Sequence, residues 1–173
     1  MKVILMGYMG SGKSVIGRLL SNTLTYDFID LDAYIEMKED MTIPEIFERK
    51  GEVYFRKKEY DHLKELLSSK DDFVLSLGGG TPCYGNNLEI IKNSIDSSIF
   101  YLKASVQTLF ERLVPEKENR PLISQIDTKE ELIDYLNKHL FERGFYYNQA
   151  DFVINVDGKN TQDVIEEVVL NLF

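Results

Sequence analysis

The residues best suited to chemistry lie in one eight-residue segment, residues 7–14, with the sequence GYMGSGKS. This segment fits the pattern G-x-x-x-x-G-K-[ST], follows an apolar run at residues 3–6 and precedes a stretch with helical spacing from 15 to about 24. Glycines let the backbone wrap closely around an anion with its N–H groups pointing inward. The segment therefore predicts a loop that holds the phosphates of a nucleoside triphosphate. The alternative is a glycine-rich turn that binds nothing, and the flanking strand and helix patterns argue against it.

This loop defines a set of nucleotide-binding candidates. They are Gly10, Ser11, Gly12, Lys13, Ser14 and Val15. We expect Lys13 to lie against the β- and γ-phosphates and the Ser14 hydroxyl to bind Mg²⁺. The helix that follows would direct the positive end of its dipole at the anion.

Two aspartates, Asp30 and Asp32, come at the end of the second apolar run, residues 28–31. In an open α/β sheet the carboxyl ends of the strands face the ligand crevice, so both side chains are expected near the phosphates. If the strand continues through them, they point to the same side. Asp30 would then help to hold Mg²⁺, and Asp32 would face the acceptor. The alternative is a strand end followed by an aspartate helix cap.

A third apolar run, residues 73–77, leads into three glycines, Gly78, Gly79 and Gly80. It lacks the acidic residue that many P-loop proteins place there to bind metal, which argues against ATPase motors and GTPases and leaves Asp30 as the best carboxylate for Mg²⁺. The bare glycine backbone could accept a bulky substrate and donate N–H groups to it. The alternative is an ordinary turn.

The elements that must position these residues alternate along the chain. Five short apolar runs predict buried strands at residues 3–6, 28–31, 73–77, 99–102 and 152–156. Thr42 with Glu45 and Thr128 with Glu131 fit the capping box of a helix start. Alternating strands and helices predict a three-layer α/β/α P-loop fold with a five-stranded parallel sheet.

Composition bounds the class of protein. The 173 residues favour a single domain over residues 1–173, and the formal net charge of −9 argues against a nucleic-acid partner. No apolar run approaches the length of a membrane helix, so a membrane partner is not expected. One cysteine and two histidines exclude an internal disulfide and argue against a zinc site. The chain is expected to be a cytoplasmic monomer.

Two segments are polar enough to be mobile, residues 38–41 and 115–128. The second carries two prolines and Arg120 and is longer than a routine connection. It predicts a mobile lid at about residues 113–126. A solvated connection between two helices is the alternative.

In order and spacing, these motifs resemble the shikimate kinase family of the nucleoside-monophosphate-kinase-like P-loop group. Beyond the loop, the aspartate pair and the glycine run, the resemblance rests on Gly17-Arg18, Ile46-Phe47, Gly51-Glu52-x-x-Phe55-Arg56, Arg120-Pro121-Leu122 and Arg143-x-x-x-Tyr147. It runs essentially end to end. It implies ATP-dependent phosphorylation of the shikimate 3-hydroxyl, giving shikimate 3-phosphate and ADP on the route to chorismate and the aromatic amino acids.

The resemblance also implies an acceptor site, with a substrate-binding helical region at about residues 32–60. Its residues would be Asp32, Phe47, Phe55, Arg56, Gly78, Gly79, Gly80 and Arg143. Arg56 and Arg143 would bind the carboxylate of shikimate, and Glu59 would orient Arg56. Asp32 would accept from the reacting hydroxyl and act as base. The glycines would contact the ring hydroxyls and the two phenylalanines would line an apolar wall.

For the nucleotide, the resemblance implies that Arg112 stacks on adenine and that Arg120 meets the transferring phosphoryl group. The catalytic set would therefore be Lys13, Asp32 and Arg120. Three departures from the family pattern affect contacts around this set: Val15 replaces a Ser or Thr, the turn at 156–160 lacks a proline, and Phe145 stands where a proline is common. None of them alters the three catalytic residues.

Two other functions fit parts of the pattern. The first is another small-molecule P-loop kinase, such as one that phosphorylates gluconate or a nucleoside monophosphate. The second is a nucleotide-binding module without catalysis, which would be marked by loss of Lys13, Asp32 or Arg120. All three are present.

Overall fold

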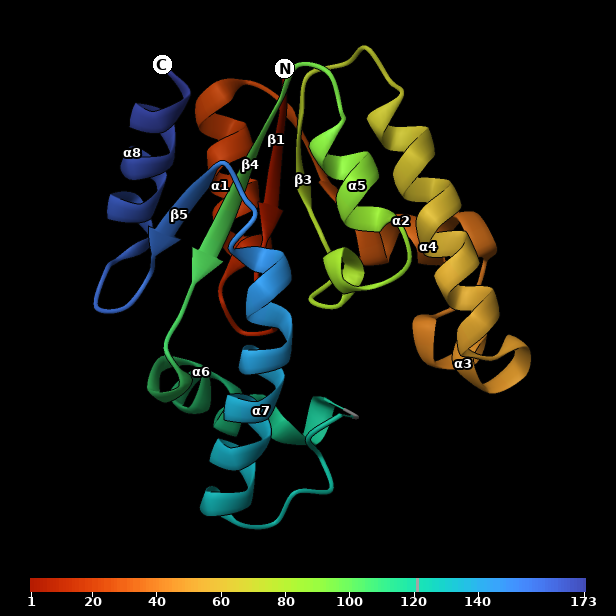
Figure 1. Cartoon of the computed structure of the whole chain (residues 1–173), viewed down its shortest axis with the longest axis vertical. Coiled ribbons are helices and arrows are strands. Elements are labelled where there is room, and N and C mark those ends of the chain that lie inside the picture. Colours follow the sequence, from red (N-terminus) through yellow and green to blue (C-terminus); the bar gives the residue numbers. More distant parts are fainter. Residues whose placement is uncertain (121) are drawn as a thin grey trace.

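A five-stranded parallel sheet forms the centre of the molecule (Figure 1). The computed structural model describes residues 1–120 and 122–173, so Pro121 of the Arg-Pro-Leu motif lies outside the described residues. The strands are β1 (Lys2–Met6), β2 (Asp27–Asp30), β3 (Phe73–Ser76), β4 (Ser97–Lys103) and β5 (Phe152–Asn155), in the order β2-β3-β1-β4-β5. The predicted sheet is confirmed. Residues 3–6 of the central strand are fully buried, as expected for a strand covered on both faces.

Helices flank this sheet and complete the predicted three layers. They are α1 (Lys13–Leu24), α2 (Leu31–Glu39), α3 (Ile43–Lys50), α4 (Glu52–Leu67), α5 (Asn87–Lys92), α6 (Val106–Leu113), α7 (Lys129–Tyr147) and α8 (Thr161–Leu172). Short 3-10 segments, η1 (Thr81–Cys83) and η2 (Val114–Asn119), follow β3 and α6. Helix α1 packs against α8, and α4 packs against α5. Among residues 1–120 and 122–173, no helix has both the length and the apolar character needed to cross a membrane.

Local sequence signals fix several helix starts. Both predicted capping boxes are present, at Thr42 with Glu45 and at Thr128 with Glu131, so free backbone N–H groups of α3 and α7 are satisfied by side chains. Helix α1 packs closely on β2 because residue 17 is glycine. A Cβ atom there would lie 2.4 Å from Cε2 of Phe28.

The second strand ends one residue earlier than the sequence pattern suggested. Strand β2 ends at Asp30 and α2 begins at Leu31, so the strand does not continue through both aspartates, and the alternative of a strand end followed by an aspartate helix cap is the one observed. The physical reason is the helix cap: the Asp30 carboxylate accepts from the backbone N–H groups of Asp32 and Ala33. Asp32 therefore lies in the first turn of a helix.

The segment predicted as a lid lies beyond the carboxyl ends of the strands, in the part of Figure 1 occupied by α6 and α7. It includes η2, which packs on α6, and α6 in turn packs on α7. The segment thus lies beyond the end of the sheet where the predicted site residues gather.

Candidate active site

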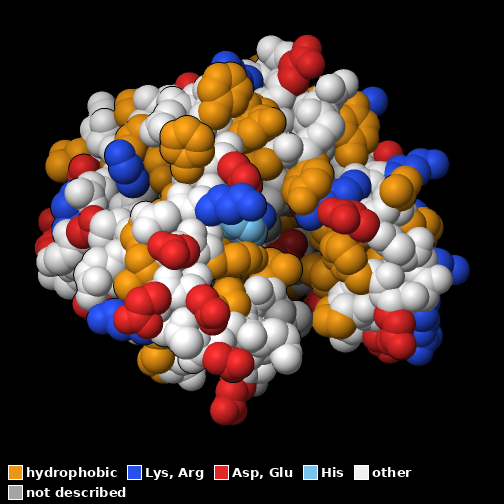
Figure 2. Space-filling view, turned by 60° about the horizontal axis from the view of Figure 1, so that its bottom comes forward, with side chains coloured by type: hydrophobic (Ala, Val, Ile, Leu, Met, Phe, Trp, Pro, Cys, Tyr) orange, Lys and Arg blue, Asp and Glu red, His pale blue; other side chains and the backbone are white. Residues whose placement is uncertain are grey.

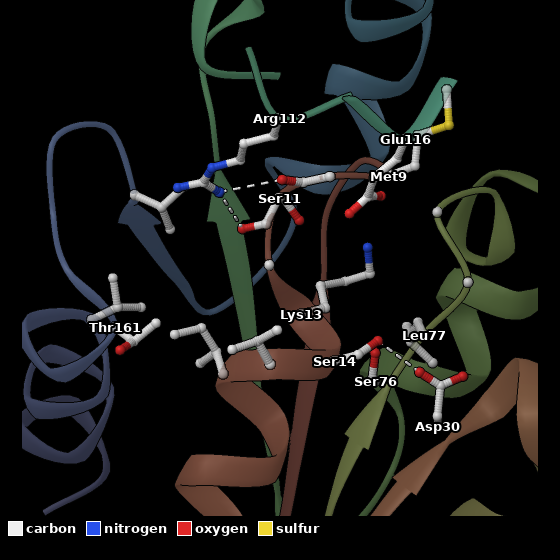
Figure 3. A pocket seen from close by; sticks show the side chains of 18 of the residues that line it. Met9, Ser11, Lys13, Ser14, Asp30, Ser76, Leu77, Arg112, Glu116 and Thr161 are labelled. Atoms are coloured by element: carbon white, nitrogen blue, oxygen red, sulfur yellow. Dashed lines mark hydrogen bonds between the residues drawn. The ribbon is translucent and has the colours of Figure 1, made fainter. Parts of the chain in front are cut away.

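The carboxyl ends of the strands open into a cavity of about 600 Å³. Its walls come from the 7–14 loop, the ends of β2 and β3, α6, η2 and the turn before α8 (Figure 3). The cavity brings together the predicted residues of the phosphate loop and six other predicted site residues: Asp30, Asp32, Gly78, Gly79, Arg112 and Arg120. Residues from distant parts of the chain therefore share one space with the phosphate loop.

The loop backbone has the conformation that its glycines predict. Gly10 and Gly12 have φ angles of 81° and 100°, in the left-handed region that favours glycine. The buried Lys13 ammonium donates to the carbonyls of Gly7 and Tyr8, at 2.9 and 3.0 Å. The Ser11 hydroxyl is buried without a hydrogen-bond partner in the described part of the chain. A phosphate oxygen held by this loop would supply its missing partner.

Burial lowers the pKa of Lys13 to about 8, against the opposing effect of the Asp32 and Asp30 carboxylates. The positive charges of Arg120 and Arg143 act in the same direction as burial, which shows that these side chains lie within electrostatic reach of Lys13. Because burial disfavours the charged form of Lys13, an anionic ligand beside it would stabilise that form.

Nucleotide binding is expected to take up a proton at Lys13. A polyphosphate beside the ammonium favours its charged form, so its pKa should rise and a large part of one proton should be taken up per Mg·ADP bound at pH 8.5. Near pH 6.5 the group is already protonated and the uptake should vanish. Titration calorimetry in buffers of different ionisation enthalpy measures both values.

The matched control for this measurement is Lys159→Met, because Lys159 lines the same cavity and is paired with Glu167. This variant should keep the uptake, and Lys13→Arg, whose guanidinium stays protonated at both pH values, should lose it. Uptake that does not change between pH 6.5 and 8.5 would contradict the assignment to Lys13.

Ser14 and Asp30 form a pair of oxygen donors at the floor of the cavity. The Ser14 hydroxyl donates to Asp30 Oδ2 at 2.8 Å, and Oδ1 of the same carboxylate caps α2 (Figure 3). One hydroxyl and one carboxylate, beside a phosphate site, is a donor set that fits Mg²⁺, which prefers oxygen ligands and usually retains several waters. The metal-binding role of both residues stays a prediction.

The Asp32 carboxylate lies against the glycine run. A Cβ atom on Gly78 would meet Asp32 Oδ1 at 2.8 Å and the Thr81 hydroxyl at 2.9 Å, so any larger residue there would displace one of these side chains. Burial raises the pKa of Asp32 to about 6, and the negative charges of Asp30 and Glu59 act in the same direction. A carboxylate with this pKa can accept a proton near neutral pH.

The two predicted carboxylate-binding arginines lie beside this cavity rather than in its walls. Arg56 lines a second hollow of about 260 Å³, where its Nη1 donates to the buried Glu59 at 2.9 Å. The Arg143 guanidinium lies 5.3 Å from the centre of the Tyr8 ring. Both positive charges act on the Cys83 thiol, whose pKa burial raises to about 11, so both arginines flank the turn after the glycine run.

The two phenylalanines predicted to line an apolar wall contact each other, and their role toward an acceptor stays a prediction. The rings of Phe47 and Phe55 lie 4.8 Å apart, Phe55 buried and Phe47 partly exposed. Figure 2, which turns this end of the molecule forward, shows a hollow bordered by hydrophobic and basic side chains with an acidic side chain deep inside. An apolar wall beside basic groups and one carboxylate suits a small hydroxylated acid.

The two arginines predicted to contact the nucleotide, Arg112 and Arg120, bind groups of the protein itself. Arg112 Nη1 donates to the carbonyls of Gly10 and Ser11, both at 3.2 Å, which places its guanidinium at the edge of the phosphate loop. Arg120 pairs with Glu116, with its Nε 3.0 Å from the carboxylate. The contacts predicted for these arginines, with adenine and with the transferring phosphoryl group, stay predictions.

Sequence reasoning missed several residues of the site. Glu116 lines the cavity beside Arg120, and its position four residues earlier is the helical ion-pair spacing that could have revealed it. Tyr8 of the phosphate loop hydrogen-bonds His139 of α7 at 3.1 Å. Tyr147, used above only as a motif position, donates to the Gly79 carbonyl at 2.5 Å. Nothing in the local sequence marks the last two contacts, because each joins distant segments.

Comparison with known proteins places this site in a family. The family model described as shikimate kinase matches residues 9–173. A shikimate kinase from Flavobacterium psychrophilum is 47% identical over 173 residues, covering 99% of each chain. The chain belongs to the shikimate kinase family. The family prediction is confirmed, and with it the class of enzyme, a kinase that transfers a phosphoryl group to an alcohol.

Solved shikimate kinases share the fold. The enzyme from Bacteroides thetaiotaomicron matches with a TM-score of 0.89 and 32% identity, covering 99% of this chain and 98% of its own. The Acinetobacter baumannii enzyme in complex with shikimate matches with a TM-score of 0.85 and 33% identity, covering 99% and 92%. A Sinorhizobium meliloti gluconokinase, at 18% identity and a TM-score of 0.62, shares only the fold. The gluconate kinase alternative is therefore a distant relation.

Proposed function

We propose that this protein transfers the γ-phosphoryl group of ATP to the 3-hydroxyl of shikimate, giving shikimate 3-phosphate and ADP. The proposal rests above all on one observation: the half-buried Asp32 carboxylate lines the same cavity as Lys13 of the phosphate loop. A phosphoryl group leaving this loop would meet an acceptor hydroxyl held by Asp32. Membership of the shikimate kinase family supports the choice of acceptor.

The chemistry of transfer is mostly charge stabilisation and positioning. Lys13 would neutralise charge on the β- and γ-phosphates from within the loop, and Arg120 would do so from the lid side of the cavity. Asp32 would orient the hydroxyl and take its proton as the oxygen attacks. Ser14 and Asp30 would hold Mg²⁺, which would supply positive charge beside the phosphates.

Selection of the acceptor would fall to the two arginines beside the glycine run. A guanidinium presents N–H groups in a planar fork that matches a carboxylate, so Arg56 and Arg143 suit the acid group of shikimate. Gly78, Gly79 and Gly80 would contact the ring hydroxyls between these arginines and Asp32.

We further propose that residues 1–173 act as one kinase domain, with the substrate-binding region at about 32–60 and the lid at about 113–126. A formal net charge of −9 and a single cysteine fit a cytoplasmic monomer that uses only small-molecule partners. Closure of the lid would bring Arg120 to the phosphates and exclude water from them.

The test is ADP release from Mg·ATP by the purified protein with shikimate, gluconate, a nucleoside monophosphate or no acceptor. We expect release only with shikimate, and none from Lys13→Ala, which serves as the blank. If ADP release depended on a different acceptor, the nucleotide site would be supported. The roles given to Asp32, Arg56 and Arg143 would be overturned. No release with any acceptor would overturn the kinase proposal.

Arg56→Ala is expected to weaken acceptor binding, because it removes one partner of a charged hydrogen-bonded pair. The loss should be about 2–5 kcal/mol, which raises the Michaelis constant for shikimate by about 30-fold or more. The constant for ATP should stay within about twofold. The control is Arg49→Ala, an exposed arginine of α3 paired only loosely with Glu45. An unchanged constant for shikimate in Arg56→Ala would count against the assignment.

A further inference from the structure

We propose that Thr81 and Tyr84 are positioning residues that hold Arg56 ready for the acceptor carboxylate. This inference rests on the proposed function, and it assigns roles to two residues outside the motifs described above. Both residues follow the glycine run, Thr81 directly after Gly80 and Tyr84 at the end of η1. They act on Arg56 by different contacts, one through a buried carboxylate and one through a ring face.

Thr81 reaches Arg56 through Glu59. The Thr81 hydroxyl donates to Glu59 Oε1 at 2.7 Å, and Glu59 Oε2 accepts from Arg56 Nη1 at 2.9 Å. Thr81 and Glu59 are 0% and 1% exposed, so water does not replace either bond. Each oxygen of the carboxylate thus has one fixed donor, and the Glu59 group cannot rotate without leaving a buried oxygen unpaired.

Thr81 is itself held in place. The Asn87 side-chain amide donates to the Thr81 carbonyl at 2.9 Å, and both groups are buried. Thr81 therefore connects the glycine run, which would hold the acceptor's hydroxyls, to Arg56, which would hold its carboxylate. A shift of the glycine run or of Arg56 would be transmitted to the other through the hydrogen bonds of Glu59 with Thr81 and Arg56.

Tyr84 covers the flat face of Arg56. The guanidinium carbon lies 3.5 Å from the centre of the Tyr84 ring, close enough for a cation–π contact. The same ring lies against Gly80, where a Cβ atom would meet Tyr84 Cε2 at 3.2 Å. The ring fixes the plane of the guanidinium, while Glu59 fixes its rotation within that plane.

This arrangement leaves part of the guanidinium free for a ligand. Arg56 Nη1 is bound to Glu59 and Nε lies 3.4 Å from Glu52, whereas Nη2 has no hydrogen-bond partner in residues 1–120 and 122–173. The arginine is about one-quarter exposed, at 23% of its side chain. An anion entering the hollow would meet donors whose direction is already set, which lowers the entropy lost on binding.

The first test removes only the Thr81 hydroxyl. Thr81→Val should raise the Michaelis constant for shikimate by about tenfold, since one Glu59 oxygen loses its donor and Arg56 loses its fixed orientation. The constant for ATP and kcat should stay within about twofold. Thr81→Ser keeps the hydroxyl and should restore the constant for shikimate, which a purely packing role for the methyl group would not do.

The second test separates the Tyr84 ring from its hydroxyl. Tyr84→Leu should raise the Michaelis constant for shikimate about fivefold, because an aliphatic side chain offers no π face. Tyr84→Phe keeps the face and should match the wild type. Unaltered binding of Mg·ADP, measured by calorimetry, would show that each variant is folded.

The outcomes distinguish the inference from the proposed function. Wild-type turnover with shikimate, together with unchanged constants for shikimate in Thr81→Val and Tyr84→Leu, would overturn the inference alone. Equal losses for ATP and shikimate, or no rescue by Thr81→Ser and Tyr84→Phe, would also overturn it. Absence of wild-type turnover with shikimate would overturn the proposed function and this inference with it.

Discussion

Arg120→Ala is expected to lower kcat by about 10³–10⁵-fold, the range found when an arginine that stabilises a transferring phosphoryl group is lost. Arg120 lines the nucleotide cavity from the lid side, and its positive charge reaches Lys13. Its effect should be confined to the transition state, where charge builds on the transferring group. The affinity for Mg·ADP, measured by calorimetry, should therefore change by less than about tenfold.

The control for this prediction is the ion-pair partner. Glu116→Gln leaves the guanidinium in place and removes the carboxylate that Arg120 Nε contacts at 3.0 Å. This variant should retain kcat within about threefold, because an exposed ion pair contributes little. If kcat of Arg120→Ala, measured with saturating substrates, decreased by less than tenfold, Arg120 would not belong to the catalytic set.

Asp32→Asn is expected to lower kcat by about 10²–10⁴-fold, the contribution of a positioned general base. The amide keeps the size of the side chain and loses the ability to take a proton. Binding of Mg·ADP should be nearly unchanged, since Lys13 and the loop backbone hold the phosphates. The matched control is Asp40→Asn at the other end of α2, an exposed residue with a φ of 51° that asparagine adopts readily. Equal turnover in Asp32→Asn and wild type would remove the assigned role.

The raised pKa of Asp32 also predicts how activity depends on pH. Because burial raises this pKa to about 6, kcat/KM for shikimate should fall as pH drops below 6 and the base becomes protonated. Asp32→Asn should lose this dependence. A wild-type profile that stays flat from pH 5 to 7.5 would contradict the assignment.

The raised pKa of Asp32 also means that its ionised carboxylate lowers the free energy of unfolding. Its pKa is about 6 when folded and 3.8 as a free side chain, so between these values the folded protein binds more protons than the unfolded chain. Stability should therefore fall as pH rises from about 4 to 6, and the full cost remains above 6. Asp32→Asn should raise the free energy of unfolding at pH 7.5 by up to about 3 kcal/mol, with a smaller gain at pH 4. A less active but more stable variant would mark Asp32 as a residue kept for function.

The sequence by itself determined the phosphate loop, the strands and the capped helices. These features depend on neighbours in the chain: glycines that permit the loop conformation, apolar runs that must be buried, and threonines that cap α3 and α7 within three residues. The parallel sheet followed, because alternating strands and helices leave few other arrangements. The family could also be predicted from the sequence, because its motifs occur in the expected order and spacing.

Tertiary structure alone decided how the site residues meet. The cap at Asp30, rather than a continued strand, brings Asp32 to Gly78, and Thr81 meets a carboxylate 22 positions earlier in the chain. Tyr8 and His139 are 131 positions apart. Local spacing carries no information about such pairs, because they form only when packed helices and strands bring buried polar groups within hydrogen-bond distance. The sequence therefore determined which groups were present, and packing decided which of them act on one another.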